Sequence, residues 1–198
     1  MRYLVLILSL EVLLRIGYLF IYPGATPPEI KQSEIVLVGD SVMRGMSLPG
    51  ALNLEQLSAT SEDTLDMVRK AVRFTPKTII IHCGYNDDRV NSKKGFRRSY
   101  LLRLLLKPFP STPSFMDYQN TTTDIHRECS RNGVEAVFLT ISTRSESERI
   151  GRMNRWLMSN FKTIEISLKP EHFLNDIHLN DSGYQEMARQ VSLRLNGR

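Results

Sequence analysis

The chain has 198 residues, enough for one domain with a well-formed core, with or without a short appendage. Its hydrophobic fraction of 41% and charged fraction of 24% are ordinary for a globular protein. The net charge of +5 favours an anionic partner such as a membrane surface or an acidic glycan. These charges form no concentrated basic stripe, so we expect no nucleic-acid partner.

A hydrophobic segment covers residues 1–22. Residues 3–22 are long enough to cross a bilayer as a helix, although Glu11 and Arg15 interrupt them. The i, i+4 spacing of these two charges lets them pair on one face of a helix. Three alternatives stay open: a membrane anchor, a secretory signal peptide, or an amphipathic helix packed on the domain or on a membrane. The first two predict a membrane-associated or extracytoplasmic protein.

A linker over 23–33, with the helix-breaking sequence PGATPP, precedes a domain over 34–198. In this domain apolar strands alternate with helical patterns. We expect strands over 34–39, 52–57, 78–83, 134–141 and 163–167, and helices over 61–73, 115–131, 147–160 and 181–195. This alternation predicts an α/β three-layer sandwich with a mainly parallel sheet of about five strands. Sites on such sheets gather at the carboxyl ends of the strands.

The sequence holds two cysteines. Cys83 ends an apolar strand and Cys129 lies in a helical pattern, so we predict two buried thiols and no disulfide bridge. No cluster of His, Cys and Asp residues at ligand spacing suggests a metal site. We therefore expect no metal and no cofactor.

The first strand is followed directly by Gly39, Asp40 and Ser41, in the stretch VLVGDSVMRG. A serine at a strand-to-helix turn stands at a helix N-terminus, whose backbone amides favour a developing negative charge. Ser41 is therefore a candidate nucleophile, and its alternative role is that of a helix N-cap. Because residue 43 is Met43, the stretch differs from the G-x-S-x-G elbow of the α/β hydrolases.

The strand over 78–83 is followed by Gly84, Tyr85, Asn86 and Asp87. Glycine lets the backbone turn tightly, and the side-chain N–H groups of Asn86 can point at an oxyanion. The alternative is a plain Asx turn, because Asn and Asp populate loops for local reasons.

A third stretch, LNDIHLNDSGY, places His178 where a loop enters the last helix. A histidine can serve as the general base for a serine nucleophile. We expect the other three histidines, His82, His126 and His172, to be surface residues.

In order and rough spacing, these three stretches resemble the conserved blocks of the SGNH or GDSL hydrolase family, and the resemblance covers essentially everything after residue 33. It implies a flavodoxin-like three-layer sandwich and a serine esterase that needs no metal. It also implies that Ser41 is the nucleophile and His178 the base. The oxyanion hole implied by the resemblance comprises the Asn86 side chain and the backbone amides of Ser41 and Ser58, where Ser58 replaces a glycine of the family. Supporting motif residues are Gly39, Asp40, Gly84, Asp87 and Asn175.

The acid of the family's triad lies three residues before the histidine, at the position of Asn175 in this chain. The nearest carboxylate is Asp176. If the segment is extended, residues two apart point to the same side, and Asp176 can reach His178. If the segment turns, Asn175 faces the ring instead. We favour Asp176 as the catalytic acid.

Two features bear on the substrate. Arg44 completes G-D-S-x-x-R, which resembles the branch of the superfamily linked to polysaccharide O-acylation and deacylation, or it is an exposed helix residue. A basic insert over about 88–114 is a cap over the site, a segment lying on anionic lipid, or a solvated loop.

Together these features predict a serine hydrolase that cleaves a carboxylic ester, either a small O-acyl group or a lipid-like ester, through an acyl-enzyme. The expected partner is a small-molecule, lipid or glycan ester, with membrane association through residues 1–22. The alternatives are a polysaccharide O-acyltransferase and a non-catalytic, membrane-tethered member of the fold that binds glycan or lipid.

Overall fold

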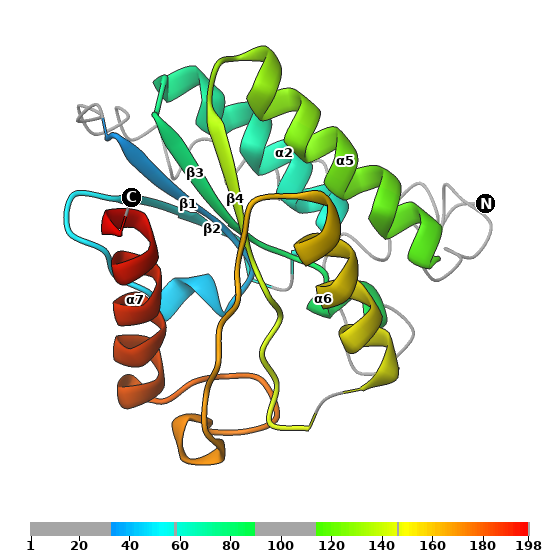
Figure 1. Cartoon of the computed structure of the whole chain (residues 1–198), viewed down its shortest axis with the longest axis vertical. Helices are drawn as coiled ribbons and strands as arrows, with labels where there is room; N and C mark the ends of the chain where they lie inside the picture. Colours follow the sequence, from blue (N-terminus) through cyan, green and yellow to red (C-terminus); the bar gives the residue numbers. More distant parts are fainter. Residues whose placement is uncertain (1–32, 58, 90–113, 146, 198) are drawn as a thin grey trace, which may run out of the picture. The chain divides into compact units, whose positions relative to one another are not determined.

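A five-stranded parallel sheet forms the centre of the fold, with the strand order β2-β1-β3-β4-β5 (Figure 1). The computed structural model describes residues 33–57, 59–89, 114–145 and 147–197. The strands are β1 Ile35–Gly39, β2 Leu52–Glu55, β3 Thr78–His82, β4 Glu135–Leu139 and β5 Thr163–Ile164. Each strand falls within a segment predicted from its apolar run, and the α/β class is confirmed.

The three central strands are apolar along almost their whole length because the sheet is covered on both faces. In β3 every residue is buried, and β1 and β4 are buried except at their first residues. The edge strand β2 is only partly buried, and the edge strand β5 has two residues. The most buried part of the sheet therefore lies along β1, β3 and β4.

Four long helices connect or follow the strands: α2 Ser61–Ala71, α5 Phe115–Arg131, α6 Glu148–Asn160 and α7 Asp181–Asn196. The connections β2 to β3, β3 to β4 and β4 to β5 all step across the sheet in one direction. Right-handed crossovers therefore place α2, α5 and α6 on one face, and α7 returns to the other face (Figure 1). The four predicted helices are confirmed. The helix expected after Ser41 is the short η1 Met43–Gly45, and η2 Val72–Phe74 follows α2 at the end of the predicted segment 61–73. The sequence did not predict α3 Tyr85–Arg89 or η3 Pro170–His172.

Polar side chains fix the starts of the long helices. Thr60 accepts a hydrogen bond from the Asp63 N–H, and the Asp63 carboxylate accepts one from the Thr60 N–H in return. Ser114 and Asp117 form the same capping box at α5. The Asn180 side chain caps α7 by accepting from the Gly183 N–H. Such caps are each worth about 1 kcal/mol, and the Asn180 cap fixes where the loop carrying His178 ends.

Both cysteines are buried and free, as predicted. Burial raises the pKa of the Cys83 thiol well above its usual value, with smaller contributions from the charges of Asp87 and Asp40. Burial likewise raises the pKa of Cys129 to about 12. Both residues therefore act as small apolar side chains, because only a thiolate is reactive.

Several predicted features lie outside the described residues. They are the hydrophobic segment 1–22, nearly all of the linker over 23–33, most of the insert over 88–114, and Ser58. In the part of the chain that the structure describes, no helix is both long and apolar enough to cross a membrane.

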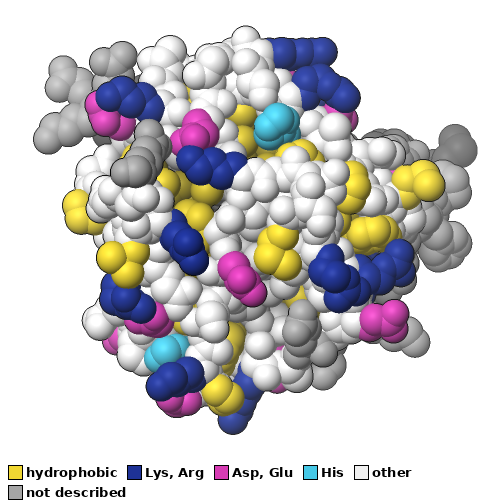
Figure 2. Space-filling model, in the orientation of Figure 1, with side chains coloured by type: hydrophobic (Ala, Val, Ile, Leu, Met, Phe, Trp, Pro, Cys, Tyr) yellow, Lys and Arg dark blue, Asp and Glu magenta, His cyan; other side chains and the backbone are white. Residues whose placement is uncertain are grey.

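On the face of the molecule shown in Figure 2, Lys and Arg side chains are scattered among Asp and Glu rather than gathered in one patch. This face of the described residues therefore presents no concentrated basic patch.

Candidate active site

The site lies at the carboxyl ends of β1 and β3, which are neighbouring strands. Gly39 at the end of β1 pairs in register with His82 at the end of β3. The residues that follow, Ser41 after β1 and Asn86 after β3, are therefore brought together by the sheet itself. This is the edge where the parallel topology predicts a site.

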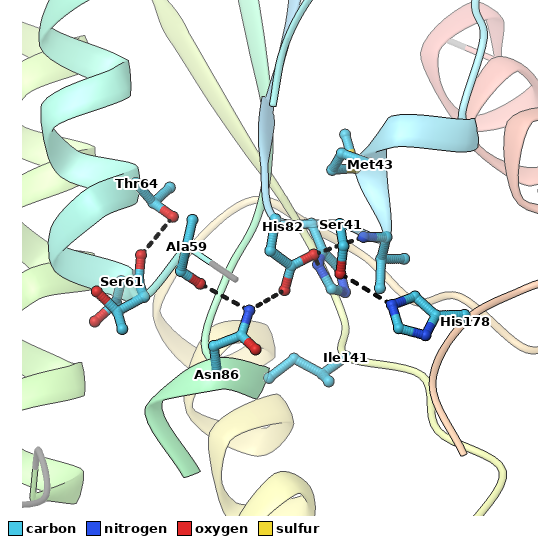
Figure 3. Close-up of polar contacts among 12 residues, drawn as sticks. Ser41, Met43, Ala59, Ser61, Thr64, His82, Asn86, Ile141 and His178 are labelled. Carbon is cyan, nitrogen blue, oxygen red and sulfur yellow. Dashed lines mark hydrogen bonds and ion pairs between the residues drawn. The ribbon is translucent and has the colours of Figure 1, made fainter. Parts of the chain in front are cut away.

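Ser41 and His178 contact each other directly, although 137 residues separate them in the sequence. The serine Oγ lies 3.2 Å from the imidazole Nε2 (Figure 3). Both residues are half-buried, so a substrate can reach them. The helical turn after Ser41 is the three-residue η1, and its N-cap is Val42 rather than Ser41. The structure thus brings together the two residues predicted as nucleophile and base.

Asp40 shapes the turn that presents Ser41. Its side chain is completely buried, and its Oδ1 accepts a hydrogen bond of 3.0 Å from the Val42 N–H. The bond closes an Asx turn around Ser41, because a short carboxylate side chain bridges to the amide two residues on. The direction in which Ser41 points therefore depends on Asp40.

His82 holds Asp40 from the neighbouring strand. Its Nδ1 lies 3.1 Å from Asp40 Oδ1, and only 2% of the His82 side chain is exposed. Our prediction that His82 is a surface residue is therefore wrong. The error has a physical cause: β3 is a central strand covered on both faces, so its last residue is buried even though it is polar. The three isoleucines that precede His82 in the sequence indicate such a buried central strand.

Asn86 lies at the start of α3, and its side chain points toward Ala59 (Figure 3). Its Nδ2 donates to the Ala59 carbonyl oxygen at 3.0 Å and to Asp40 Oδ2 at 3.4 Å. The bond to Asp40 is the longer and weaker of the two. The geometry thus places an amide donor beside the nucleophile turn, where the sequence predicted one.

Asp87 anchors the segment that precedes α2. Its buried carboxylate accepts hydrogen bonds from the Ser61 N–H at 3.0 Å and from the Ser61 Oγ at 2.8 Å. Burial raises the pKa of Asp87 to about 6, although the bonds from Ser61 and the charge of Arg149 act in the opposite direction. Ser61 was not among the predicted site residues. The Ser61–Asp87 pair holds two segments together. Ser61 lies two residues after Ala59, and Asp87 directly follows Asn86.

The two predicted motif glycines allow close approaches of the backbone. Gly84 has a φ of +113°, and a Cβ there would lie 2.7 Å from Tyr118 Cε2. A Cβ at Gly39 would lie 2.6 Å from the His82 carbonyl oxygen. A side chain at Gly39 would therefore press on the end of β3, and a side chain at Gly84 would press on Tyr118 of α5.

Asn175, and not Asp176, contacts the ring of His178. The Asn175 Nδ2 lies 3.1 Å from His178 Nδ1, whereas the Asp176 side chain is exposed. The Asn175 Oδ1 accepts hydrogen bonds from the backbone N–H groups of Ile177 at 3.1 Å and of His178 at 2.9 Å. These bonds curl the segment into a turn, in which residues three apart face each other. Our preference for Asp176 as the catalytic acid is therefore wrong, because it assumed an extended segment.

Arg44 has an exposed side chain, and its Nε lies 3.9 Å from Glu55 Oε1 on β2. This position fits the alternative of an exposed residue on the short helix η1. The backbone amide of Ser58, which the family resemblance adds to the oxyanion hole, lies outside the described residues.

The described residues contain no group of three or more His, Cys, Asp or Glu side chains that could hold a metal ion. A hollow of about 390 Å³ opens at the ends of β4 and β5. Ile141, Asn154, Arg155, Glu165 and Phe173 are among its lining residues. It is a neighbouring feature, because neither Ser41 nor His178 lines it.

Comparison with known proteins identifies the fold. No family model and no curated protein matches the chain. A GDSL-like lipase from Bacteroides thetaiotaomicron matches at a TM-score of 0.61 and 14% identity, covering 91% of this chain and 96% of that one. An acetylxylan esterase from Geobacillus stearothermophilus matches at a TM-score of 0.59 and 14% identity, covering 81% and 92%. An α/β hydrolase from the metagenome of Lake Arreo matches at 0.56 and 16%, covering 82% and 94%.

The chain thus has the fold of the SGNH hydrolases: an α/β fold whose five-stranded parallel sheet is flanked by helices. The fold implied by the three sequence motifs is confirmed. At these identities the similarity concerns the fold, and any activity has to come from the residues at the carboxyl ends of β1 and β3.

Proposed function

We propose that the protein is a serine esterase, which cleaves carboxylic esters through an acyl-enzyme. The observation that carries this proposal is the 3.2 Å contact between Ser41 Oγ and His178 Nε2 at the carboxyl end of β1. A serine next to a histidine is the pairing that activates a hydroxyl for attack on an acyl carbonyl. The fold gives further support, because two of its solved examples are described as a lipase and an acetylxylan esterase.

In the proposed reaction, Ser41 Oγ attacks the acyl carbonyl carbon while its proton passes to His178 Nε2. The former carbonyl oxygen becomes an oxyanion in the tetrahedral intermediate. His178 then donates the proton to the alcohol oxygen, the ester C–O bond breaks, and the acyl group stays on Ser41. Water then attacks the acyl carbon while it gives a proton to His178. The bond between the acyl carbon and Ser41 Oγ breaks, the proton passes from His178 back to Ser41 Oγ, and the carboxylic acid leaves.

The oxyanion would be held by the Asn86 side chain and the backbone N–H of Ser41, with the Ser58 amide as a third donor. Asn86 is suited to this role because its Nδ2 lies beside the Asp40–Ser41 turn and makes one long bond, 3.4 Å, that can be exchanged. Preorganised donors of this kind account for a large part of the rate enhancement in acyl transfer.

For the substrate, we propose a small O-acyl ester of a sugar as the first class to test, with lipid-like esters second. The acetylxylan esterase among the structural matches supports this order. We also propose that residues 1–22 keep the protein at a membrane or lead it out of the cytoplasm, which the apolar sequence of 3–22 supports. Flotation of the full chain with lipid vesicles, beside a chain that starts at residue 33, tests the membrane part.

The experiment for the proposed activity is labelling with a fluorophosphonate probe, followed by peptide mass spectrometry. We expect slow but specific modification at Ser41 that is lost in Ser41→Ala and strongly reduced in His178→Ala. Hydrolysis of p-nitrophenyl acetate and of an acetylated xylooligosaccharide should show the same dependence on both residues. If the folded wild type is neither labelled nor able to cleave these esters, the proposed esterase is contradicted and a binding protein is favoured. Transfer of acetyl to an added glycan instead of water would identify an acyltransferase.

A further inference from the structure

The orientation of the Asn175 amide is fixed by its backbone partners. Its Oδ1 faces the N–H groups of Ile177 and His178 at 3.1 and 2.9 Å. A backbone N–H only donates, so the side-chain atom that faces two of them has to be the oxygen. The Asn175 nitrogen is therefore the atom that lies 3.1 Å from His178 Nδ1.

This orientation determines which ring nitrogen of His178 carries the proton. The Nδ2 of an asparagine only donates, so His178 Nδ1 has to accept. A neutral imidazole holds one N–H, and that N–H is then at Nε2. Nε2 is the atom that faces Ser41 Oγ at 3.2 Å. In this state the ring donates a hydrogen bond to the serine, whereas a general base has to accept the serine's proton.

We infer that Asn175 is a positioning residue that holds His178 in the tautomer unable to act as a base, and so keeps Ser41 weakly reactive. The inference rests on the proposed esterase function, which it deepens. Moving the proton to Nδ1 would set two donors, Nδ1–H and the Asn175 NH₂, against each other. Turning the amide over would relieve that clash only by giving up both bonds that Oδ1 makes to the backbone.

An aspartate at position 175 would reverse this situation without changing the turn. One carboxylate oxygen can accept from the N–H groups of Ile177 and His178, as Oδ1 does now. The other can accept from His178 Nδ1–H, which leaves Nε2 free to take the Ser41 proton. In serine proteases the opposite change, from aspartate to asparagine, lowers kcat by about 10⁴ because it selects the wrong tautomer. Asn175→Asp should therefore raise the reactivity of Ser41.

Asp176 does not supply the missing carboxylate. Its side chain is exposed, and its carbonyl oxygen accepts a hydrogen bond of 2.8 Å from the Arg144 N–H. This bond ties Asp176 to the loop after β4, while the next two backbone N–H groups are held by Asn175. Asp176→Asn is therefore a matched control. It exchanges an acid for an amide at the neighbouring residue, whereas Asn175→Asp exchanges an amide for an acid.

The experiment compares wild type, Asn175→Asp and Asp176→Asn in the full chain, and its first readout is the ring tautomer. The chain has four histidines, and with ¹⁵N-labelled histidine the NMR signals of His178 are assigned by their loss in His178→Ala. At about pH 8, where an ordinary ring is neutral, we expect a protonated Nε2 in wild type and in Asp176→Asn. We expect a protonated Nδ1 in Asn175→Asp. If Asn175 served only to stabilise the turn, Asn175→Asp would leave the protonated nitrogen of His178 unchanged.

The second readout is the rate at which a fluorophosphonate modifies Ser41. We expect Asn175→Asp to react about 10²–10⁴ times faster than wild type, and Asp176→Asn to react at the wild-type rate. A protonated Nδ1 in wild type, or equal labelling rates in wild type and Asn175→Asp, would overturn the inference while leaving the esterase proposal intact. A tautomer switch in Asn175→Asp without any labelling of Ser41 would support the assignment of Asn175 and contradict the esterase proposal.

Discussion

His82 at the end of β3 and Asp40 after β1 form a hydrogen-bonded pair that is closed off from solvent, with 3.1 Å between Nδ1 and Oδ1. Asp40 in turn holds the Val42 N–H and sets the turn around Ser41. The nucleophile is thus supported by a histidine from the neighbouring strand that never reaches the surface.

His82→Ala should leave the buried Asp40 carboxylate without one of its hydrogen-bond partners. We expect the free energy of unfolding to fall by about 3 kcal/mol, because a buried carboxylate oxygen loses a hydrogen-bond partner and nothing replaces it. Urea denaturation followed by circular dichroism measures it. His126→Ala is the control, because His126 is exposed on α5 beside the ring of Phe161, so its loss should cost less than about 1 kcal/mol. Equal losses in the two variants would contradict a supporting role for His82.

Asp87 should make stability depend on pH. Burial raises its pKa from 3.8 to about 6 in the folded protein, so folding favours the protonated form. The stability linked to Asp87 is therefore fully present below about pH 4 and is lost as the pH rises through about 6. A shift of this size corresponds to an effect on the order of 3 kcal/mol.

The Asp87→Asn variant isolates that effect from all other carboxylates. We expect wild type to lose stability relative to Asp87→Asn between about pH 4 and pH 7, as measured by urea midpoints at both values. Ser61 can still pair with the amide, because its hydroxyl both donates and accepts. A difference between the two proteins that stays constant with pH would show that Asp87 does not titrate in this range.

Asn86→Ala tests the oxyanion donor. If Asn86 holds the developing oxyanion, kcat for p-nitrophenyl acetate should fall by about 10²–10³ with little change in KM. Asn132→Ala removes an exposed amide at the end of α5 and serves as the control with unchanged kinetics. A decrease below fivefold in Asn86→Ala would remove Asn86 from the mechanism.

Gly84→Ala should both destabilise the protein and displace Asn86. The φ of +113° is unfavourable for alanine, and the new Cβ would lie 2.7 Å from Tyr118 Cε2. We expect a loss of about 3 kcal/mol in stability, from backbone strain and overpacking together. Gly133→Ala separates backbone strain from overpacking. Gly133 has a φ of +68°, and a Cβ there would lie in open space. Its expected cost is about 1 kcal/mol, and a similar cost at both glycines would argue against close packing at Gly84.

Much of the fold could be predicted from the sequence because burial on both faces leaves long apolar runs. The isoleucines of β3 and the valines of β1 are unambiguous for this reason. The same logic places Ser41 and Asn86 at one edge of the sheet, since parallel strands end together. The contact of Ser41 with His178 followed from motif order, because no local pattern links residues so far apart in the chain.

Other features depend on conformations that sequence spacing leaves open. Asn175 and Asp176 compete for one ring, and the outcome is decided by the two backbone N–H groups that Asn175 accepts. Asparagine side chains often accept hydrogen bonds from the backbone two or three residues on and so form turns. This preference favours the observed turn, in which Asn175 faces His178. The prediction of an exposed His82 followed from its residue type alone. His82 is buried because it ends a central strand that is covered on both faces.

The loop that carries His178 has a consequence for the order in which the protein matures. All five strands precede this loop in the chain, and a single antiparallel bridge between Phe173 and Leu179 closes it. A chain emerging from the ribosome can therefore complete its sheet, with the Ser41 turn already formed, before the residue that would accept its proton is available. We expect nascent chains to pass through a folded stage in which Ser41 is unreactive, and reactivity to arise only when this last loop docks.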